Sequence, residues 1–380
     1  MTARIRLLFT AIAALLLAAA VPALAAPGAS AAEGQFAHPM FVPGHAAPGL
    51  IQPALTPSGY GPSDLQSAYK LPSSTNGSGQ TVAIVDAYND PTAEADLGVY
   101  RAQYGLPACT TANGCFRKVN QTGGTSYPAT DAGWATEISL DLDMVSATCP
   151  KCHILLVEAT TASYANLGKA VNEAAALHAN AISNSYGGGD VSDSSAPYYN
   201  HPGIAVTASS GDSGYGVQFP ASSHYVTAVG GTTLTKAGNA RGWTETVWSG
   251  AGSGCSTLNT ALTGAASFGT GCSKRAEADV SAVANPSTGV AVYDSTPYGG
   301  RSGWQVYGGT SVSSPIIASV FALAGNTASI NNNYPYSHSG SFFDVTSGSN
   351  GSCSPSQLCK ARVGWDGPTG LGTPNGTGGF

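Results

Sequence analysis

The chain alternates short, continuously apolar runs with longer segments in which apolar residues recur at helical spacing. Apolar runs of this kind are typical of strands that are buried on both faces, as in a parallel sheet covered by helices. The expected strands span residues 81–86, 153–157, 181–185, 204–209 and 225–229. The expected helices span residues 91–104, 134–145, 164–177 and 311–325. This order predicts an α/β fold with one domain, in which helices cover both faces of a mainly parallel sheet.

The first residues have the composition of an export signal. Two arginines precede an apolar stretch at residues 7–20, and an Ala-Leu-Ala at residues 23–25 offers a small-residue cleavage site. Residues 1–25 are therefore expected to be a signal peptide, with cleavage after Ala31 as the alternative. No later apolar run reaches the roughly 18 to 20 residues that a membrane span requires. We expect a secreted, extracellular protein with no membrane attachment once the signal is removed.

The remaining chain divides into a lead-in and one domain. Residues 32–63 are rich in Pro, Gly, Ala and His without periodicity, which predicts an extended lead-in. The folded domain is expected at residues 64–380. Within it, residues 230–306 are rich in Gly, Ser and Thr, as expected for long loops or irregular strands.

Charge is sparse in this sequence. Charged residues make up 9% of the chain, against about 25% in typical soluble domains. The 15 basic and 21 acidic side chains give a formal net charge of −6, so no nucleic-acid partner is expected. Because the chain has few charged groups, protonation of its carboxylates in acid leaves little net positive charge to repel itself within the folded protein. The composition therefore favours a fold that tolerates low pH.

The eight cysteines fit an oxidising compartment. They fall in close pairs, and bonding of neighbour with neighbour is the favoured interpretation among many possible connectivities: Cys109 with Cys115, Cys149 with Cys152, Cys255 with Cys272, and Cys353 with Cys359. A redox-active dithiol at Cys149 and Cys152 is a weaker alternative, because the strand and helix that usually flank such a motif are missing. A zinc site is weaker still, since His153 is the only further ligand nearby.

Ser311 is a candidate nucleophile. It opens an apolar helix that is entered through Gly308 and Gly309, where backbone N–H groups can face developing negative charge. The alternative is that Ser311 or Thr310 merely caps the helix.

Glu137 and Asp141 form a second candidate group. Residues four apart share one face of a helix, where two like charges repel. A solvated acidic face is the plain alternative, but the residues around them, from Trp134 to Val145, are mostly apolar and leave little room for one.

Several segments, in order, resemble the sedolisin family of serine-carboxyl peptidases, which share the subtilisin fold but replace its histidine base with a glutamate. None of the histidines in the folded region has the glycine-rich setting of a subtilisin base; these are His153, His178, His201, His224 and His338. The resemblance runs from about residue 65 to residue 372, and the segments that carry it are Glu137-x-x-x-Asp141, residues 209–214 with Asp212, residues 219–223 leading to 229–232, Gly309-Thr310-Ser311, residues 344–346, and residues 364–372.

The resemblance implies a subtilisin-like domain that hydrolyses protein or peptide substrates at acidic pH through an acyl-enzyme. In this family's mechanism Ser311 is the nucleophile, Glu137 the general base, and Asp141 the residue that tunes Glu137. Asp212 holds a protonated carboxyl toward the oxyanion, although a turn aspartate is the alternative. Asp86 follows a buried strand and is interpreted as structural.

The resemblance also implies one calcium ion near the C-terminus. Asp344 and Asp366 supply carboxylates, and the backbone carbonyls of Val345, Arg362 and Gly364 complete an oxygen-rich shell suited to a hard cation. Arg362 stands where the family usually has glycine, which is tolerable because only its main chain binds. A pair of turn aspartates is the alternative.

One departure from the family is the absence of a long pro-domain before residue 64. The domain is therefore expected to fold unaided or with a separate folding helper or inhibitor, as a monomer, and its lead-in is open to trimming by the enzyme itself. Two other functions stay open. One is a catalytically silent secreted binding protein on a peptidase scaffold, and the other is a neutral-pH subtilisin relative that uses Asp86 and an unrecognised histidine.

Overall fold

A computed structural model describes residues 36–44 and 57–380. The signal peptide expected at residues 1–25, and its alternative cleavage point, lie outside the described residues. Across the described ranges no helix is both long and apolar enough to traverse a bilayer.

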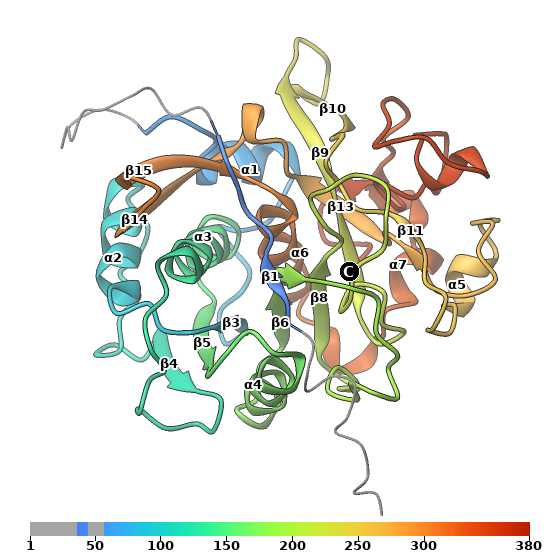
Figure 1. The fold of residues 1–380 in the computed structure, drawn as a ribbon. Coiled ribbons are helices and arrows are strands. Elements are labelled where there is room, and N and C mark those ends of the chain that lie inside the picture. Colours follow the sequence, from blue (N-terminus) through green and yellow to red (C-terminus); the bar gives the residue numbers. More distant parts are fainter. Residues whose placement is uncertain (1–35, 45–56) are drawn as a thin grey trace, which may run out of the picture.

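The centre of the molecule is an eight-stranded sheet with the order β10-β9-β8-β6-β3-β5-β4, in which β13 also pairs with β9 (Figure 1). All its pairs are parallel except β10 with β9. The strands are β3 (Thr81–Ala87), β4 (Phe116–Asn120), β5 (His153–Ala159), β6 (Ala181–Asn184), β8 (Ala205–Ser209), β9 (Thr227–Lys236), β10 (Trp243–Val247) and β13 (Val280–Val283).

Three of the four long helices pack directly on the two faces of this sheet, and the remaining one, the first in the chain, packs on the second. The four helices are α2 (Ala93–Gln103), α3 (Ala132–Thr148), α4 (Tyr164–Ala176) and α6 (Thr310–Ala324). Successive strand side chains point to opposite faces, so Ile84 of β3 joins the core with α3 and α6 while Ala83 and Val85 join the core with α4. The predicted α/β fold, with a mainly parallel sheet and helices on both faces, is confirmed.

The sequence prediction missed regular structure at residues 230–306. This region contributes β10, β13 and a hairpin of β14 (Val290–Tyr298) and β15 (Arg301–Gly308). The hairpin packs against α3. The prediction also missed β4, which does not form an apolar run because only Phe116 and Val119 of its five residues are buried.

Within the expected lead-in, residues 36–44 form two short strands that pair with the domain, and Pro62 and Ser63 already belong to the first helix, α1 (Pro62–Ala68). Strand β1 (His38–Pro39) lies antiparallel to β7 (Tyr186–Gly187), and β2 (Val42–Pro43) lies antiparallel to β15. The remaining short elements are α1 (Pro62–Ala68), α5 (Thr263–Ala266), α7 (Tyr334–Ser337), β11 (Gly254–Cys255), β12 (Ala276–Glu277), β16 (Phe342–Phe343), β17 (Thr373–Pro374) and the 3-10 turns Pro286–Thr288, Thr327–Ser329, Ser339–Ser341 and Ser356–Leu358.

All eight cysteines are bonded to their sequence neighbours, as favoured by the sequence: Cys109–Cys115, Cys149–Cys152, Cys255–Cys272 and Cys353–Cys359. Both sulfurs of the Cys149–Cys152 bridge belong to fully buried residues. A buried disulfide beside the apolar core has the surroundings of a structural bridge, not of an accessible redox centre.

Candidate active site

Ser311 lies in the first turn of α6, directly after a glycine corner. Gly309 has φ 99°, a backbone conformation that residues with a side chain rarely adopt. The helix is buried on all sides and ends at Gly325 with φ 71°. Because Pro315 has no N–H to donate to the Ser311 carbonyl, that oxygen instead faces the Ser185 hydroxyl at 3.4 Å. The Ser311 hydroxyl is directed to the carbonyl oxygen of Ser185, also at a long 3.4 Å.

Glu137 and Asp141 project from α3, which packs against α6, and both side chains are fully buried. Asp141 Oδ1 accepts a hydrogen bond of 2.8 Å from the Ser185 hydroxyl. Among the described residues, neither carboxyl oxygen of Glu137 has a hydrogen-bond partner. The solvated acidic face considered from the sequence is therefore wrong, because both side chains are buried. Burying two carboxyls without full pairing costs free energy, which favours a functional role over a purely structural one.

Asp212 follows β8 and reaches the same helix start. Its Oδ1 accepts hydrogen bonds from the backbone N–H and the hydroxyl of Thr310, at 2.7 and 2.8 Å. Its Oδ2 is buried and has no partner among the described residues. A Cβ placed on Gly309 would lie 2.6 Å from this Oδ2, so only glycine leaves the space beside it open.

The environment raises the pKa of every acid in this group. Burial is the main cause for Glu137, followed by the charges of Asp141 and Asp86, whereas the neighbouring Ser311 hydroxyl lowers the pKa. Burial followed by the charge of Asp86 raises the pKa of Asp141 well above its usual range, whereas the hydroxyl of Ser185 and the neighbouring carboxyl of Glu137 lower it. Burial raises the pKa of Asp212 to about 7, despite the lowering effect of Thr310.

Asp86, at the end of β3, is the acid that the sequence interpretation undervalued. It is fully buried, and neither of its carboxyl oxygens has a partner in the described part of the chain. Burial and the charge of Glu158 raise its pKa well above the usual range. The charge of Asp86 raises the pKa of both Glu137 and Asp141, so Asp86 lies close enough to influence the candidate site.

The structure thus brings together Glu137, Asp141, Asp212 and Ser311, which lie on three separate elements. The pairing of a serine with carboxyls whose pKa values are raised suits acyl transfer, in which a carboxylate accepts the serine proton and a protonated carboxyl stabilises an oxyanion.

The loop expected to hold calcium brings its two aspartates together. Asp344 Oδ2 accepts from the Gly364 N–H at 2.9 Å, and Asp366 Oδ2 accepts from the Arg362 N–H at 3.2 Å. The charge of Asp344 adds to the burial that raises the pKa of Asp366 to about 7. Within the described residues the carbonyls of Val345, Arg362 and Gly364 accept no hydrogen bond.

This donor set is chemically compatible with a hard cation, which prefers carboxylate and carbonyl oxygens. The Arg362 side chain donates to the carbonyl of Trp365, within the same loop, and to that of Phe268, so its guanidinium is held by these carbonyls. Among the described residues no group of three or more His, Cys, Asp or Glu side chains gathers as a metal centre. Two carboxylates with three carbonyls remain a candidate site.

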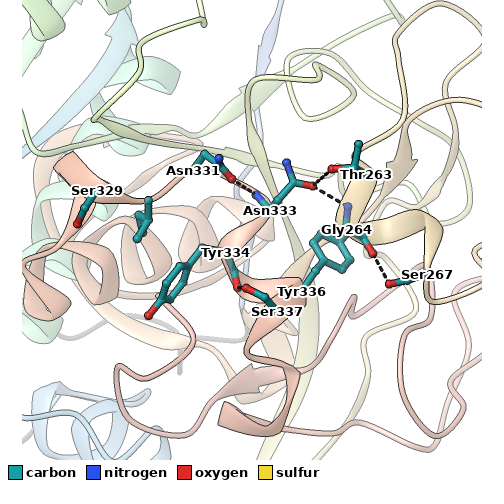
Figure 2. A pocket seen from close by; sticks show the side chains of 10 residues that line it. Thr263, Gly264, Ser267, Ser329, Asn331, Asn333, Tyr334, Tyr336 and Ser337 are labelled. Atoms are coloured by element: carbon teal, nitrogen blue, oxygen red, sulfur yellow. Dashed lines mark hydrogen bonds between the residues drawn. The ribbon is translucent and has the colours of Figure 1, made fainter.

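A pocket of about 470 Å³ lies apart from these residues. Figure 2 shows its lining, which comes from α5, α7 and the segment before α7, and includes Thr263, Asn333 and Tyr336. None of the candidate catalytic or calcium-binding residues lines it. The Asn333 side chain bridges its two sides by accepting from the Gly264 N–H at 2.7 Å.

Comparison with known proteins agrees with the geometry. Residues 122–337 match the profile described as the subtilase family. Kumamolisin from Bacillus sp. (strain MN-32) is 30% identical over 362 residues, which cover 84% of this chain and 63% of that protein. The chain therefore spans less than two thirds of the length of this relative.

Two solved structures share the fold. Pseudomonas sedolisin, a serine-carboxyl proteinase complexed with two molecules of pseudo-iodotyrostatin, superposes with a TM-score of 0.69 at 24% identity, covering 84% of this chain and 96% of that chain. Fervidolysin from Fervidobacterium pennivorans, a keratinolytic enzyme related to subtilisin, gives a TM-score of 0.51 at 15% identity over 88% of this chain and 50% of that chain. Together with a glutamate in place of a histidine beside the serine, these findings show that the chain belongs to the subtilase family as a sedolisin-type member.

Proposed function

We propose that this protein is a secreted serine-carboxyl endopeptidase that hydrolyses peptide bonds at acidic pH through an acyl-enzyme on Ser311. One observation carries the proposal: Ser311 at the start of α6, Glu137 and Asp212 lie together. The Ser311 hydroxyl lowers the pKa of the buried Glu137 carboxyl, and a buried carboxyl oxygen of Asp212 lies beside Gly309 at the same helix start. Secretion is supported by the four disulfides and the export-like N-terminus.

In the first step Glu137 accepts the proton of Ser311 Oγ as that oxygen attacks the carbonyl carbon of the substrate. The negative charge that develops on the carbonyl oxygen is stabilised by the Ser311 N–H and by the protonated Oδ2 of Asp212. Glu137 then gives its proton to the leaving amine. Water attacks the acyl-enzyme in the second half of the reaction, with the same groups acting in reverse order.

Acidic pH follows from the roles of these carboxyls. Asp212 can donate a hydrogen bond only while it is protonated, and its pKa of about 7 keeps it so in acid. Glu137 must be ionised to act as a base, and its pKa is raised by burial and by its acidic neighbours. Because these groups interact, the limits of activity belong to the cluster and not to any one residue.

The neutral-pH alternative with a histidine base has little support. No histidine is among the described groups that shift the pKa of Glu137 or Asp141. Three of the histidines in the folded domain contact backbone carbonyls outside this site, at Tyr198, Thr260 and Tyr334.

We further propose that the loop of Asp344 and Asp366 binds one calcium ion, with the carbonyls of Val345, Arg362 and Gly364 as further ligands. The ion would neutralise the repulsion between the two carboxylates and hold the C-terminal loop in place. Substrates are proteins or peptides. The protein is proposed to be a monomer that folds either alone or with the help of a separate protein.

Trapping of the acyl-enzyme tests the catalytic proposal and separates it from a silent binding scaffold. The protein is mixed at acidic pH with a p-nitrophenyl ester, quenched in strong acid and examined by peptide mass mapping. We expect one acyl mass on the peptide that contains Ser311, and none in the Ser311→Ala variant. The matched control is Ser319→Ala on the same helix, because the Ser319 hydroxyl is buried and without a partner among the described residues. A folded wild-type protein that gains no acyl group would favour the silent scaffold.

A further inference from the structure

The side chain of Gln218 lies between two glycines. A Cβ placed on Gly187 would come 2.6 Å from the Oε1 of Gln218, and a Cβ placed on Gly211 would come 2.9 Å from its Nε2. Gly211 has φ 120°, a backbone conformation that favours glycine. Because neither glycine carries a side chain, the amide of Gln218 reaches into the space between them.

This space adjoins the candidate catalytic residues on both sides. Gly211 directly precedes Asp212, the acid proposed to stabilise the oxyanion. Gly187 lies two residues after Ser185, whose carbonyl oxygen is 3.4 Å from the Ser311 hydroxyl. Both walls of the space therefore belong to segments that carry or contact the proposed catalytic groups.

The side chain of Met40 enters the same space. The Met40 carbonyl accepts a hydrogen bond of 3.0 Å from the Ser311 N–H, the position in which the proposed mechanism needs the carbonyl of the bond to be cut. The Cε of Met40 lies 2.7 Å from the Cβ placed on Gly187, so it is a neighbour of the Gln218 amide. Met40 thus stands in for the substrate residue that contributes the acyl group, and shows that the side chain of this residue points to Gln218.

The amide of Gln218 lacks a hydrogen-bond donor. Its Oε1 is buried, and none of the described residues donates to it. Met40 cannot supply the missing bond, because the end of a methionine side chain has no proton to donate. A buried carbonyl oxygen without a partner costs free energy, which a ligand with a suitably placed donor recovers.

From this geometry we infer that Gln218 determines specificity on the acyl side of the cut, where it selects a long unbranched side chain that ends in a hydrogen-bond donor. The inference rests on the proposed function and names the class of substrate that this site prefers. Glutamine fits best, because its side chain has the length of methionine and its terminal amide donates to the Oε1 of Gln218. An apolar side chain of the same length fills the space but leaves that oxygen unpaired, and a site built for a polar group rejects such an analogue.

Lysine also carries donors, but its charge makes it a poorer fit. Burying an ammonium group beside a neutral amide is costly. The nearest buried acid on β12, Glu277, does not offset this cost in acid, because burial raises its pKa well above the usual range. The pocket is therefore expected to prefer a neutral donor to a cation.

The experiment compares peptides that are identical except for the residue before the bond to be cut, which is glutamine, norleucine or lysine. Norleucine has the unbranched length of methionine and no polar group at its end. The value of kcat/KM is measured at acidic pH with wild type, Gln218→Leu and the control Gln103→Leu, and mass spectrometry of the products identifies the bond that is cut. Gln103 is an exposed glutamine at the end of α2.

We expect wild type and Gln103→Leu to cut the glutamine peptide about tenfold more efficiently than the norleucine peptide, and the lysine peptide less efficiently than the glutamine peptide. In Gln218→Leu the preference should reverse in favour of norleucine, because leucine offers no acceptor. The ratio of two substrates is measured with one enzyme preparation, so a general loss of folded or active protein does not change it.

A conservative variant separates the hydrogen bond from the shape of the pocket. Gln218→Glu has a side chain of the same shape, and one of its carboxyl oxygens can still accept. We expect it to keep the preference for glutamine over norleucine, which Gln218→Leu loses, and to cut the lysine peptide better as the pH rises and the carboxyl ionises.

The possible failures are distinguishable. A wild type that cuts the glutamine and norleucine peptides equally well would overturn the inference and leave the proposed function intact. An unchanged ratio in Gln218→Leu would overturn the role of Gln218.

A wild type that cuts no peptide and no denatured protein at any pH would overturn the proposed function. The pocket is then tested by the binding of the same peptides to Ser311→Ala. Equal Kd values for the glutamine and norleucine peptides would overturn the inference as well, whereas tighter binding of the glutamine peptide would support the pocket without the activity.

Discussion

The carboxyl of Asp212 accepts two hydrogen bonds from Thr310, the residue directly before Ser311, at 2.7 Å from the amide and 2.8 Å from the hydroxyl. Both bonds reach Oδ1, so Oδ2 is left without a hydrogen-bond partner among the described residues. Burial raises the pKa of this carboxyl to about 7. The contact with Thr310 therefore fixes the orientation of an acid that is protonated under acidic conditions.

Replacing Asp212 by asparagine should extend activity toward neutral pH. An amide can accept from Thr310 and donate to the oxyanion at any pH, whereas the acid donates only while protonated. We expect the alkaline limb of kcat/KM to move upward in Asp212→Asn, with activity at the optimum within about tenfold of wild type, and Asp212→Ala to lose about 10²–10³-fold. The measurement is kcat/KM of the three proteins from pH 3 to 8. An unchanged alkaline limb in Asp212→Asn would contradict the oxyanion role.

Replacing Asp86 by asparagine should shift the acid limb to lower pH. The charge of Asp86 raises the pKa of both Glu137 and Asp141, so its removal lets Glu137 ionise in stronger acid. The control is Asp143→Asn. Asp143 is a buried aspartate on α3, the helix that carries Glu137, but it is not among the groups that shift the pKa of Glu137. Equal acid limbs in wild type and Asp86→Asn would show that Asp86 serves the scaffold alone.

The protein should be more stable in acid than at neutral pH. The buried acids have folded-state pKa values above their unfolded values, as for Asp212 and Glu158 at about 7. The folded state then binds more protons, so their contribution is complete below about pH 4 and is lost as pH rises through about 7. One group shifted this far accounts for on the order of 4 kcal/mol, which corresponds to a Tm lower by about 10 °C at pH 8 than at pH 4.

Scanning calorimetry of Ser311→Ala measures this dependence without self-digestion. A Tm that is constant or rises between pH 4 and pH 8 would mean that the buried acids relax into water or find charged partners. All samples contain excess calcium, so that the proposed calcium site is treated alike across the series.

Removing calcium should lower the stability of the protein. An ion that binds only the folded state stabilises it in proportion to the logarithm of its concentration over Kd. We expect a chelator to lower the Tm by several degrees and calcium to restore it, and Asp344→Asn to remove most of this response. Asp131→Asn is the control, because asparagine caps a helix as well as the aspartate that now caps α3. A Tm indifferent to chelator would leave Asp344 and Asp366 as turn residues.

The sequence predicted the strongly apolar strands and helices, because an element that is buried on all sides has an apolar sequence that can be recognised without the rest of the fold. It did not predict the hairpin of β14 and β15, which lies in a region rich in Gly, Ser and Thr and is held by pairing between its strands and by packing on α3. It also did not predict that Met40 meets Ser311. That contact joins residues far apart in the chain through backbone atoms, which carry no sequence signal.

The sequence could single out Glu137, Asp141 and Asp212 as candidates because each of them stands in a short motif. Asp86 was the exception. A strand-end aspartate has many structural roles, and only the fold shows that it faces Glu137 and Asp141 without a hydrogen-bond partner of its own in the described residues.

The most direct test of the account is the pH dependence of protein cleavage by wild type and by Ser311→Ala, prepared identically, from pH 2.5 to 8. The account predicts that wild type digests a denatured protein in acid, that its activity falls as pH rises through about 7 with the ionisation of Asp212, and that Ser311→Ala is inactive throughout. Activity that survives in Ser311→Ala, or that peaks above pH 7, would contradict it.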